Sequence, residues 1–171
     1  MAQKAIFLDR DDTLIDDPGY IREPEQIKLL PGAAEAIVQF KKMGYLLIIL
    51  TNQSAIARGL LTEEKLASIH QRLKSMLAAE GAFIDRIYYC PYHPDGTVEG
   101  YNIESPLRKP SPGMFHLAAK ELDIDLSRSW MIGDRYRDIE AGKAAGCHTI
   151  LVDAPGKIRE QKSTGPLPDR K

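Results

Sequence analysis

Three carboxylates stand within four positions near the start of the chain, where Asp9, Asp11 and Asp12 follow the apolar run Ala5-Ile-Phe-Leu. A short apolar run of this kind is typical of a buried strand in a parallel sheet. Carboxylates that close together repel one another unless a cation lies between them or one of them stays protonated. The stretch therefore predicts a metal site or an acid–base site. The alternative is an acidic turn that does no more than end a strand.

The elements that must position these groups are five short apolar runs that alternate with four amphipathic stretches. Strands are expected at 4–8, 45–50, 86–90, 129–132 and 148–152. Helices are expected to begin at Pro31-Gly32, at Thr62, at Ser111-Pro112 and around Asp138. This alternation predicts an α/β fold of the Rossmann-like type, a three-layer sandwich with helices on both faces of a central parallel sheet. Residues 1–153 are expected to form one domain, and the polar residues 154–171 a mobile tail.

Polar residues follow the strands at the edge where the carboxyl ends of parallel strands meet and where such folds bind ligands. In chain order they are Asp9, Asp11, Thr51, Asn52, Arg108, Lys109, Asp134 and Asp138. The carboxylates offer hard oxygen ligands, which suit magnesium better than zinc. Lys109 and Thr51 are suited to neutralise and hydrogen-bond phosphoryl oxygens. A bare carboxylate could attack a phosphoryl group and form an aspartyl-phosphate, while a second one protonates the departing alkoxide.

Composition narrows the function classes. The formal net charge of the 171 residues is -1, which argues against a nucleic-acid or anionic-membrane surface. Two cysteines are too few for a disulfide framework, no apolar run reaches membrane-spanning length, and no signal peptide is visible. We therefore expect a cytoplasmic monomer whose partner is a small phosphorylated molecule, with neither nucleic acid nor membrane as a partner.

Four motifs resemble, in order, those of the haloacid dehalogenase-like (HAD-like) phosphatases over about residues 4–153. They are Asp9-Arg-Asp11-Asp-Thr13, Thr51-Asn52, Lys109 and Gly133-Asp134-Arg-Tyr-Arg-Asp138. Three longer stretches resemble one branch of that superfamily: Thr51-Asn-Gln-Ser-Ala-Ile-Ala-Arg58-Gly, Tyr88-Tyr-Cys-Pro-Tyr-His-Pro and Arg108-Lys109-Pro-Ser-Pro-Gly-Met. This branch holds the heptose 1,7-bisphosphate phosphatases and the histidinol phosphatases, and the resemblance is greater to the heptose enzymes.

The resemblance implies a magnesium-dependent phosphomonoesterase that removes the 7-phosphate of a heptose bisphosphate. It makes Asp9 the nucleophile and a metal ligand. It makes Asp11 the general acid and base, which also lends its backbone carbonyl to the metal. Thr51 and Lys109 would hold the phosphoryl group.

Further roles follow from the same resemblance. Asp134 would ligate magnesium, and Asp138 would support it from behind the ligands. The candidates for the sugar end of the substrate or its second phosphate are Asn52, Ser54, Arg58 and Arg108. The loops after the first and third strands are too short for an inserted cap domain, so a capless enzyme is expected.

Two departures from the family pattern concern the loops. Asp12 stands where the family usually has Gly, which is favoured in a backbone turn beside a phosphate. The branch often carries a structural zinc, but the matching positions here are Cys90, Tyr92, Ser105 and Leu107. One ligand does not make a tetrahedral site, so we expect no zinc, and aromatic packing in its place.

Alternatives remain open at this level. A histidinol-phosphate phosphatase, or another small sugar-phosphate phosphatase of the same branch, would share the motifs, although arginines near the pocket favour a bisphosphate. A receiver-type signalling domain would place its Thr and Lys after later strands. His70, in the second helix, is expected to be solvated.

Overall fold

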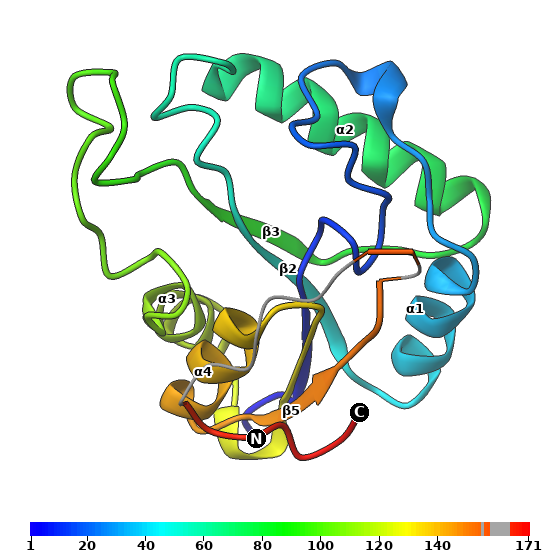
Figure 1. Cartoon of the computed structure of the whole chain (residues 1–171). Helices are drawn as coiled ribbons and strands as arrows, with labels where there is room; N and C mark the ends of the chain where they lie inside the picture. The colour runs from blue at the N-terminus through cyan, green and yellow to red at the C-terminus, as the bar shows by residue number, and fades with distance from the viewer. Residues whose placement is uncertain (155, 158–164) are drawn as a thin grey trace.

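The central sheet consists of five parallel strands in the order β3-β2-β1-β4-β5 (Figure 1). The computed structural model describes residues 1–154, 156–157 and 165–171. The strands are β1 (Ala5–Leu8), β2 (Leu46–Asn52), β3 (Arg86–Cys90), β4 (Trp130–Gly133) and β5 (His148–Leu151). The chain runs outward from β1 to β3, then crosses back to place β4 on the other side of β1. Ligands of such sheets bind at this switch point, and Asp9 and Asp134 leave the sheet on either side of it.

Four helices cover the two faces of the sheet, as the sequence predicted. Figure 1 shows α1 (Ala33–Lys42) and α2 (Glu63–Ala79) on one side, and α3 (Gly113–Leu122) and α4 (Tyr136–Ala145) on the other. Strand β1 alternates between the layers, since Ile6 and Leu8 join the core under α1 and α2, and Ala5 and Phe7 join the core under α3 and α4. The expected three-layer sandwich is therefore confirmed. Among the described residues, no helix is long and apolar enough to cross a bilayer.

Two long loops rise from the carboxyl edge of the sheet. The loop of residues 9–32 folds back on itself through an antiparallel bridge between Ile15 and Leu29, and contains one short 3-10 helix (Pro24–Gln26). The loop of residues 91–112 is anchored by the N–H groups of Thr97 and Val98, which donate to the carbonyl of Ala57. Neither loop carries a folded insertion, so the capless architecture is confirmed for the described residues.

The end of the chain departs from the expected mobile tail. Arg170 pairs with β5 through a bridge to Ile150, and the Asp169 carboxylate accepts a hydrogen bond of 2.7 Å from the N–H of Thr149. Asp169 also forms an ion pair with Lys143 of α4. An edge strand offers unpaired backbone groups that a returning segment can satisfy, so these last residues are fixed to the sheet. Residues 155 and 158–164 of the tail lie outside the described residues.

Candidate active site

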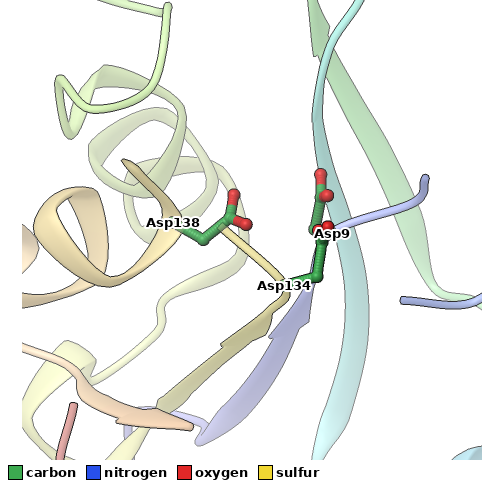
Figure 2. Close-up of side chains that lie close together, drawn as sticks. All are labelled: Asp9, Asp134 and Asp138. Atoms are coloured by element: carbon green, nitrogen blue, oxygen red, sulfur yellow. The ribbon is translucent and has the colours of Figure 1, made fainter. Parts of the chain in front are cut away.

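Three carboxylates converge at the switch point of the sheet. Asp9 follows β1, Asp134 follows β4 and Asp138 lies in the first turn of α4, and oxygens of all three lie within 4.8 Å of one another (Figure 2). All three residues are buried. The sequence placed Asp138 behind the metal ligands, whereas its carboxylate belongs to the same cluster. Three negative charges in so small a volume repel one another and require positive charge nearby.

Lys109 supplies one such charge. Its ammonium donates hydrogen bonds of 2.7 Å to Asp9 Oδ1, to Asp138 Oδ1 and to the carbonyl of Leu50. Burial alone would lower the pKa of Lys109, but the charges of Asp138 and Asp9 outweigh burial and raise it. The side chain is 1% exposed, so all three of its protons are directed at protein oxygens. Lys109 therefore stays charged and fixes the orientation of the nucleophile candidate.

Two backbone features place Asp138 in this cluster. Its Oδ2 accepts a hydrogen bond of 3.1 Å from the N–H of Arg135, which caps the start of α4. Gly133 leaves the necessary space, because a Cβ at that position would lie 2.4 Å from Asp138 Oδ2. The Gly133-Asp134 pair at the end of β4 is thus explained by the approach of α4 to the strand.

Asp134 has one oxygen without a partner. Its Oδ2 accepts a hydrogen bond of 3.1 Å from Arg135 Nε, but its Oδ1 is buried and has none. Burial, with the charges of Asp9 and Asp138, raises the pKa of Asp134 to about 8. A divalent cation between the carboxylates would satisfy the orphaned oxygen and relieve the repulsion, and an all-oxygen donor set suits Mg²⁺. The residues present therefore fit the predicted magnesium site.

The Asp11 carboxylate lies apart from this cluster. Its Oδ1 accepts hydrogen bonds from Arg10, at 2.9 Å from Nε and 2.8 Å from NH2, and its Oδ2 accepts one of 3.2 Å from Gln53. Burial raises the pKa of Asp11 in spite of the Arg10 charge. A carboxyl group with a raised pKa is suited to give a proton to a leaving group. This environment agrees with the general acid role that the resemblance implies.

Arg10 is itself held from behind by His70. The side chain of Arg10 is 2% exposed, and its NH1 lies 3.2 Å from His70 Nε2. Burial, followed by the charge of Arg10, lowers the pKa of His70 to about 3. A guanidinium only donates, so the neutral imidazole accepts. The expectation that His70 is solvated was wrong, because α2 turns this position toward the loop that follows β1.

The residues at the carboxyl end of β2, and Gln53 directly after it, act mainly on their neighbours. Thr51 Oγ1 accepts a hydrogen bond of 2.8 Å from Gln53 Nε2. The Asn52 amide accepts from the N–H of Lys109 and donates to its carbonyl, each at 3.0 Å. Asn52 therefore anchors the loop that carries Lys109. No role is predicted for Gln53 from the sequence, although its position directly after Thr51-Asn52 was the available signal.

A cavity of about 420 Å³ opens over these groups. Asp9, Asp11 and Asp134 line it, while Thr51 and Lys109 are each 1% exposed and lie behind its wall. The predicted substrate-binding residues on its wall are Asn52, Ser54, Arg58 and Arg108. The structure adds lining residues that the sequence analysis did not select: Arg10, Tyr20, Arg135 and Arg137. Their signal was weak, because each is an ordinary polar or aromatic residue in a loop or a first helical turn.

Asp12 adopts the backbone conformation that explains why the family favours Gly there. Its φ is 58°, in the left-handed region. Its carboxylate accepts a hydrogen bond of 3.0 Å from the N–H of Asp17 and forms an ion pair with Lys157. The additional negative charge is thus partly neutralised within the chain.

The loop of residues 91–108 is tied to α2 by tyrosines. The hydroxyls of Tyr89 and Tyr101 each donate a hydrogen bond of 2.7 Å to Glu63, and Tyr92 stacks on Tyr101 with ring centroids 5.9 Å apart. Cys90 is buried, and burial raises the pKa of its thiol. Aromatic contacts and one carboxylate therefore hold this loop against α2. The absence of zinc itself stays a prediction.

Comparison with known proteins places this geometry in a family. Residues 106–168 match the model of the HAD-hydrolase-like family. Over 159 residues, the chain is 46% identical to the D-glycero-beta-D-manno-heptose-1,7-bisphosphate 7-phosphatase of Pasteurella multocida, with coverage of 92% of this chain and 86% of the relative. The chain belongs to the HAD-like hydrolases.

Two further relatives of this HAD-like hydrolase inform its chemistry. The D-glycero-alpha-D-manno-heptose-1,7-bisphosphate 7-phosphatase of Burkholderia mallei is 41% identical over 152 residues, covering 89% of this chain and 80% of the relative. The crystal structure of the D,D-heptose 1,7-bisphosphate phosphatase of B. bronchiseptica, complexed with magnesium and phosphate, has a TM-score of 0.77 and 35% identity. That match covers 87% of this chain and 80% of the other. The B. bronchiseptica phosphatase is thus a related structure that holds both magnesium and phosphate.

Proposed function

We propose that the protein is a magnesium-dependent D-glycero-D-manno-heptose 1,7-bisphosphate 7-phosphatase. The observation that carries the substrate is the 46% identity, over 92% of the chain, to an enzyme named for this reaction. The chemistry is supported by the cluster of Asp9, Asp134 and Asp138, which Lys109 contacts from behind the cavity wall. The arginines of the cavity favour a bisphosphate over histidinol phosphate, whose single phosphate and amine offer them less negative charge.

In the first half of the reaction, a carboxylate oxygen of Asp9 attacks the phosphorus of the 7-phosphate. A bond forms between Asp9 and phosphorus, and the bond from phosphorus to the sugar oxygen breaks. Asp11 gives its proton to the departing alkoxide. Lys109 orients Asp9 through their 2.7 Å contact, and its positive charge offsets the negative charge that accumulates on the phosphoryl oxygens.

In the second half, the aspartyl-phosphate on Asp9 is hydrolysed. Asp11, now a carboxylate, takes a proton from a water molecule, and that water attacks the phosphorus. The bond to Asp9 breaks, and inorganic phosphate leaves. The hydrogen bonds from Arg10 and Gln53 hold Asp11 in place while it first gives a proton and later takes one back.

Magnesium would be held by the carboxylates of Asp9 and Asp134 and by the backbone carbonyl of Asp11. When bound, it neutralises the carboxylates and the phosphate that would otherwise repel each other. Asp138 is proposed to orient Lys109 and the start of α4, with which it forms its observed contacts. Thr51, Asn52 and Ser54 are proposed to complete the phosphoryl and sugar contacts. Arg58 and Arg108 are proposed to meet the second phosphate.

Phosphate release with magnesium tests the proposal. The substrates are both anomers of the heptose 1,7-bisphosphate, histidinol phosphate and fructose 1,6-bisphosphate, with the Asp9→Asn variant as the blank. We expect a preference of at least about tenfold in kcat/KM for one heptose anomer. A preference for histidinol phosphate would overturn the substrate assignment, and equal slow turnover of all substrates would overturn it as well.

We further propose that the enzyme works in the cytoplasm as a monomer. Cys90 and Cys147 are both buried and unpaired, which fits a reducing compartment. The cavity is complete within one chain, since its catalytic and cationic groups come from the same set of loops. Sedimentation of the purified protein at micromolar concentration tests the oligomeric state.

A further inference from the structure

Three arginines line the cavity without taking part in the carboxylate cluster. Arg58 follows β2, Arg108 precedes Lys109 in the loop before α3, and Arg137 lies in the first turn of α4. Burial lowers the pKa of Arg108, and the positive charges of Arg137 and Arg58 lower it further. Arg108 therefore lies near enough to both of the other guanidinium groups to feel their charge, and all three line the same cavity.

Arg108 and Arg137 each carry a buried nitrogen that is not satisfied. Arg108 NH1 and Arg137 Nε are buried without a hydrogen-bond partner, and within the described ranges no carboxylate forms an ion pair with either residue. The other arginines of the cavity differ, since Arg10 binds Asp11 at 2.8 Å and Arg135 binds Asp134 at 3.1 Å. Half-buried guanidinium groups without partners lose hydration and gain nothing in return. An anion that enters the cavity would satisfy both.

The fold keeps these two arginines together. Lys109 and Asp138 form a buried ion pair of 2.7 Å between the loop before α3 and the first turn of α4. Arg108 and Arg137 are the chain neighbours of that pair and both line the cavity, so the same contact fixes their two backbone segments relative to each other. The amino terminus of α4 adds partial positive charge to this wall. The result is a rigid cationic corner beside the catalytic carboxylates.

We propose that Arg137 is a specificity-determining residue, which together with Arg108 binds the second phosphate of a sugar bisphosphate while the first faces Asp9. This inference rests on the proposed function, which supplies a substrate with two phosphates. A phosphate dianion suits these two arginines better than a carboxylate does. It carries more negative charge, and it has enough oxygens to accept paired hydrogen bonds from two guanidinium groups. Arg137 thereby adds a third cation to Arg58 and Arg108, which the resemblance made candidates for this phosphate.

The test compares two substrates that differ only in the second phosphate: heptose 1,7-bisphosphate and heptose 7-phosphate. We expect the ratio of their kcat/KM values to fall at least tenfold in Arg137→Gln, mainly through KM of the bisphosphate. Arg137→Lys keeps the charge and should recover part of the ratio. Calorimetry with the product heptose 1-phosphate, which keeps the second phosphate, should show a matching rise in Kd.

Arg128→Gln is the matched control, because Arg128 is an exposed arginine before β4, at the opposite edge of the sheet. If Arg137→Gln lowered kcat/KM for both substrates equally, Arg137 would act only through Asp138 and the inference would be wrong. An unchanged ratio would overturn it too. A wild-type protein without preference for the bisphosphate would instead overturn the proposed function, so the two failures are distinguishable.

Discussion

Lys109 and Asp138 form a 2.7 Å ion pair that solvent does not reach, with side chains 1% and 0% exposed. The pair joins the loop before α3 to the start of α4, and through Asp9 it reaches the end of β1. A buried charge is tolerated only with a partner in good geometry. The pair is therefore at once a structural link between three segments and the support of the nucleophile.

Lys109→Met should both inactivate and destabilise the protein. Removal of the ammonium leaves Asp138 buried and unpaired, which should lower the free energy of unfolding by about 3 kcal/mol. The double variant Lys109→Met/Asp138→Asn should regain stability but no activity. Urea unfolding of the metal-free proteins measures this, with exposed Lys120→Met as the control. If Lys109→Met were as stable as Lys120→Met, the Lys109–Asp138 ion pair would have no structural role.

Asp11→Asn should affect substrates according to their leaving groups. The heptose alkoxide needs a proton as it departs, whereas p-nitrophenolate does not. We therefore expect kcat/KM to fall by about 10²-fold or more for the heptose bisphosphate and much less for p-nitrophenyl phosphate. Steady-state kinetics with both substrates decides the point. A loss of the same size for each would show that Asp11 does not act as the acid in the first half of the reaction.

Asp134→Asn should stabilise the metal-free protein while it removes the response to magnesium. The pKa of Asp134 rises on folding from 3.8 to about 8, so between these pH values the folded protein holds a proton that the unfolded chain has released. Metal-free stability should therefore fall as pH rises through this window. At pH 8 the variant should melt at a higher temperature than the wild type without metal.

Magnesium supplies the complementary measurement. At about 100 times Kd, a bound ion adds about 2.7 kcal/mol to wild-type stability, and it should add little to Asp134→Asn. The gain should be larger at pH 8 than at pH 6, because protons compete for the same oxygens. Thermal melts with and without the ion measure it. A wild-type gain that Asp134→Asn retains would remove Asp134 from the metal site.

His70 should make the protein sensitive to acid. Its pKa falls on folding from 6.5 to about 3, so between these values the unfolded chain binds a proton that the folded protein excludes. Stability should therefore decrease as pH drops below 6.5, by about 3 kcal/mol at pH 4.5. His70→Gln should lose this part of the pH dependence, and exposed His116→Gln should keep it. Urea unfolding at pH 7 and at pH 4.5 gives the change in the free energy of unfolding for each variant. An equal change in His70→Gln and His116→Gln would contradict the buried neutral imidazole.

Glu63 should replace a metal as the anchor of the loop of residues 91–108. Its carboxylate accepts hydrogen bonds from Tyr89 and Tyr101, so Glu63→Ala should loosen the loop and raise KM for the sugar substrate a few-fold, roughly the effect of one or two hydrogen bonds. The adjacent Glu64→Ala is the control. A zinc chelator should change neither KM nor the melting temperature, and a marked loss of stability on chelation would reveal a zinc site.

The amino-acid sequence alone determined the elements and the edge at which the chemistry occurs. The strand Ala5–Leu8 depends on residues that are adjacent in the chain. So does the helix cap at Thr62, whose hydroxyl accepts a hydrogen bond of 3.1 Å from the N–H of Lys65. Local patterns record such preferences directly. The convergence of Asp9 and Asp134 also followed, because parallel strands must end at a common edge.

Tertiary structure alone decided which side chains meet. Arg10 reaches His70 across 60 positions, and Lys109 reaches Asp9 across 100. Asp138 entered the carboxylate cluster because Gly133 lets α4 approach the strand. The approach of Arg137 to Arg108 depends on the same packing. Such partnerships depend on the angle and depth at which helices pack on the sheet, which arise from the summed burial of many side chains and leave no periodic trace in the chain.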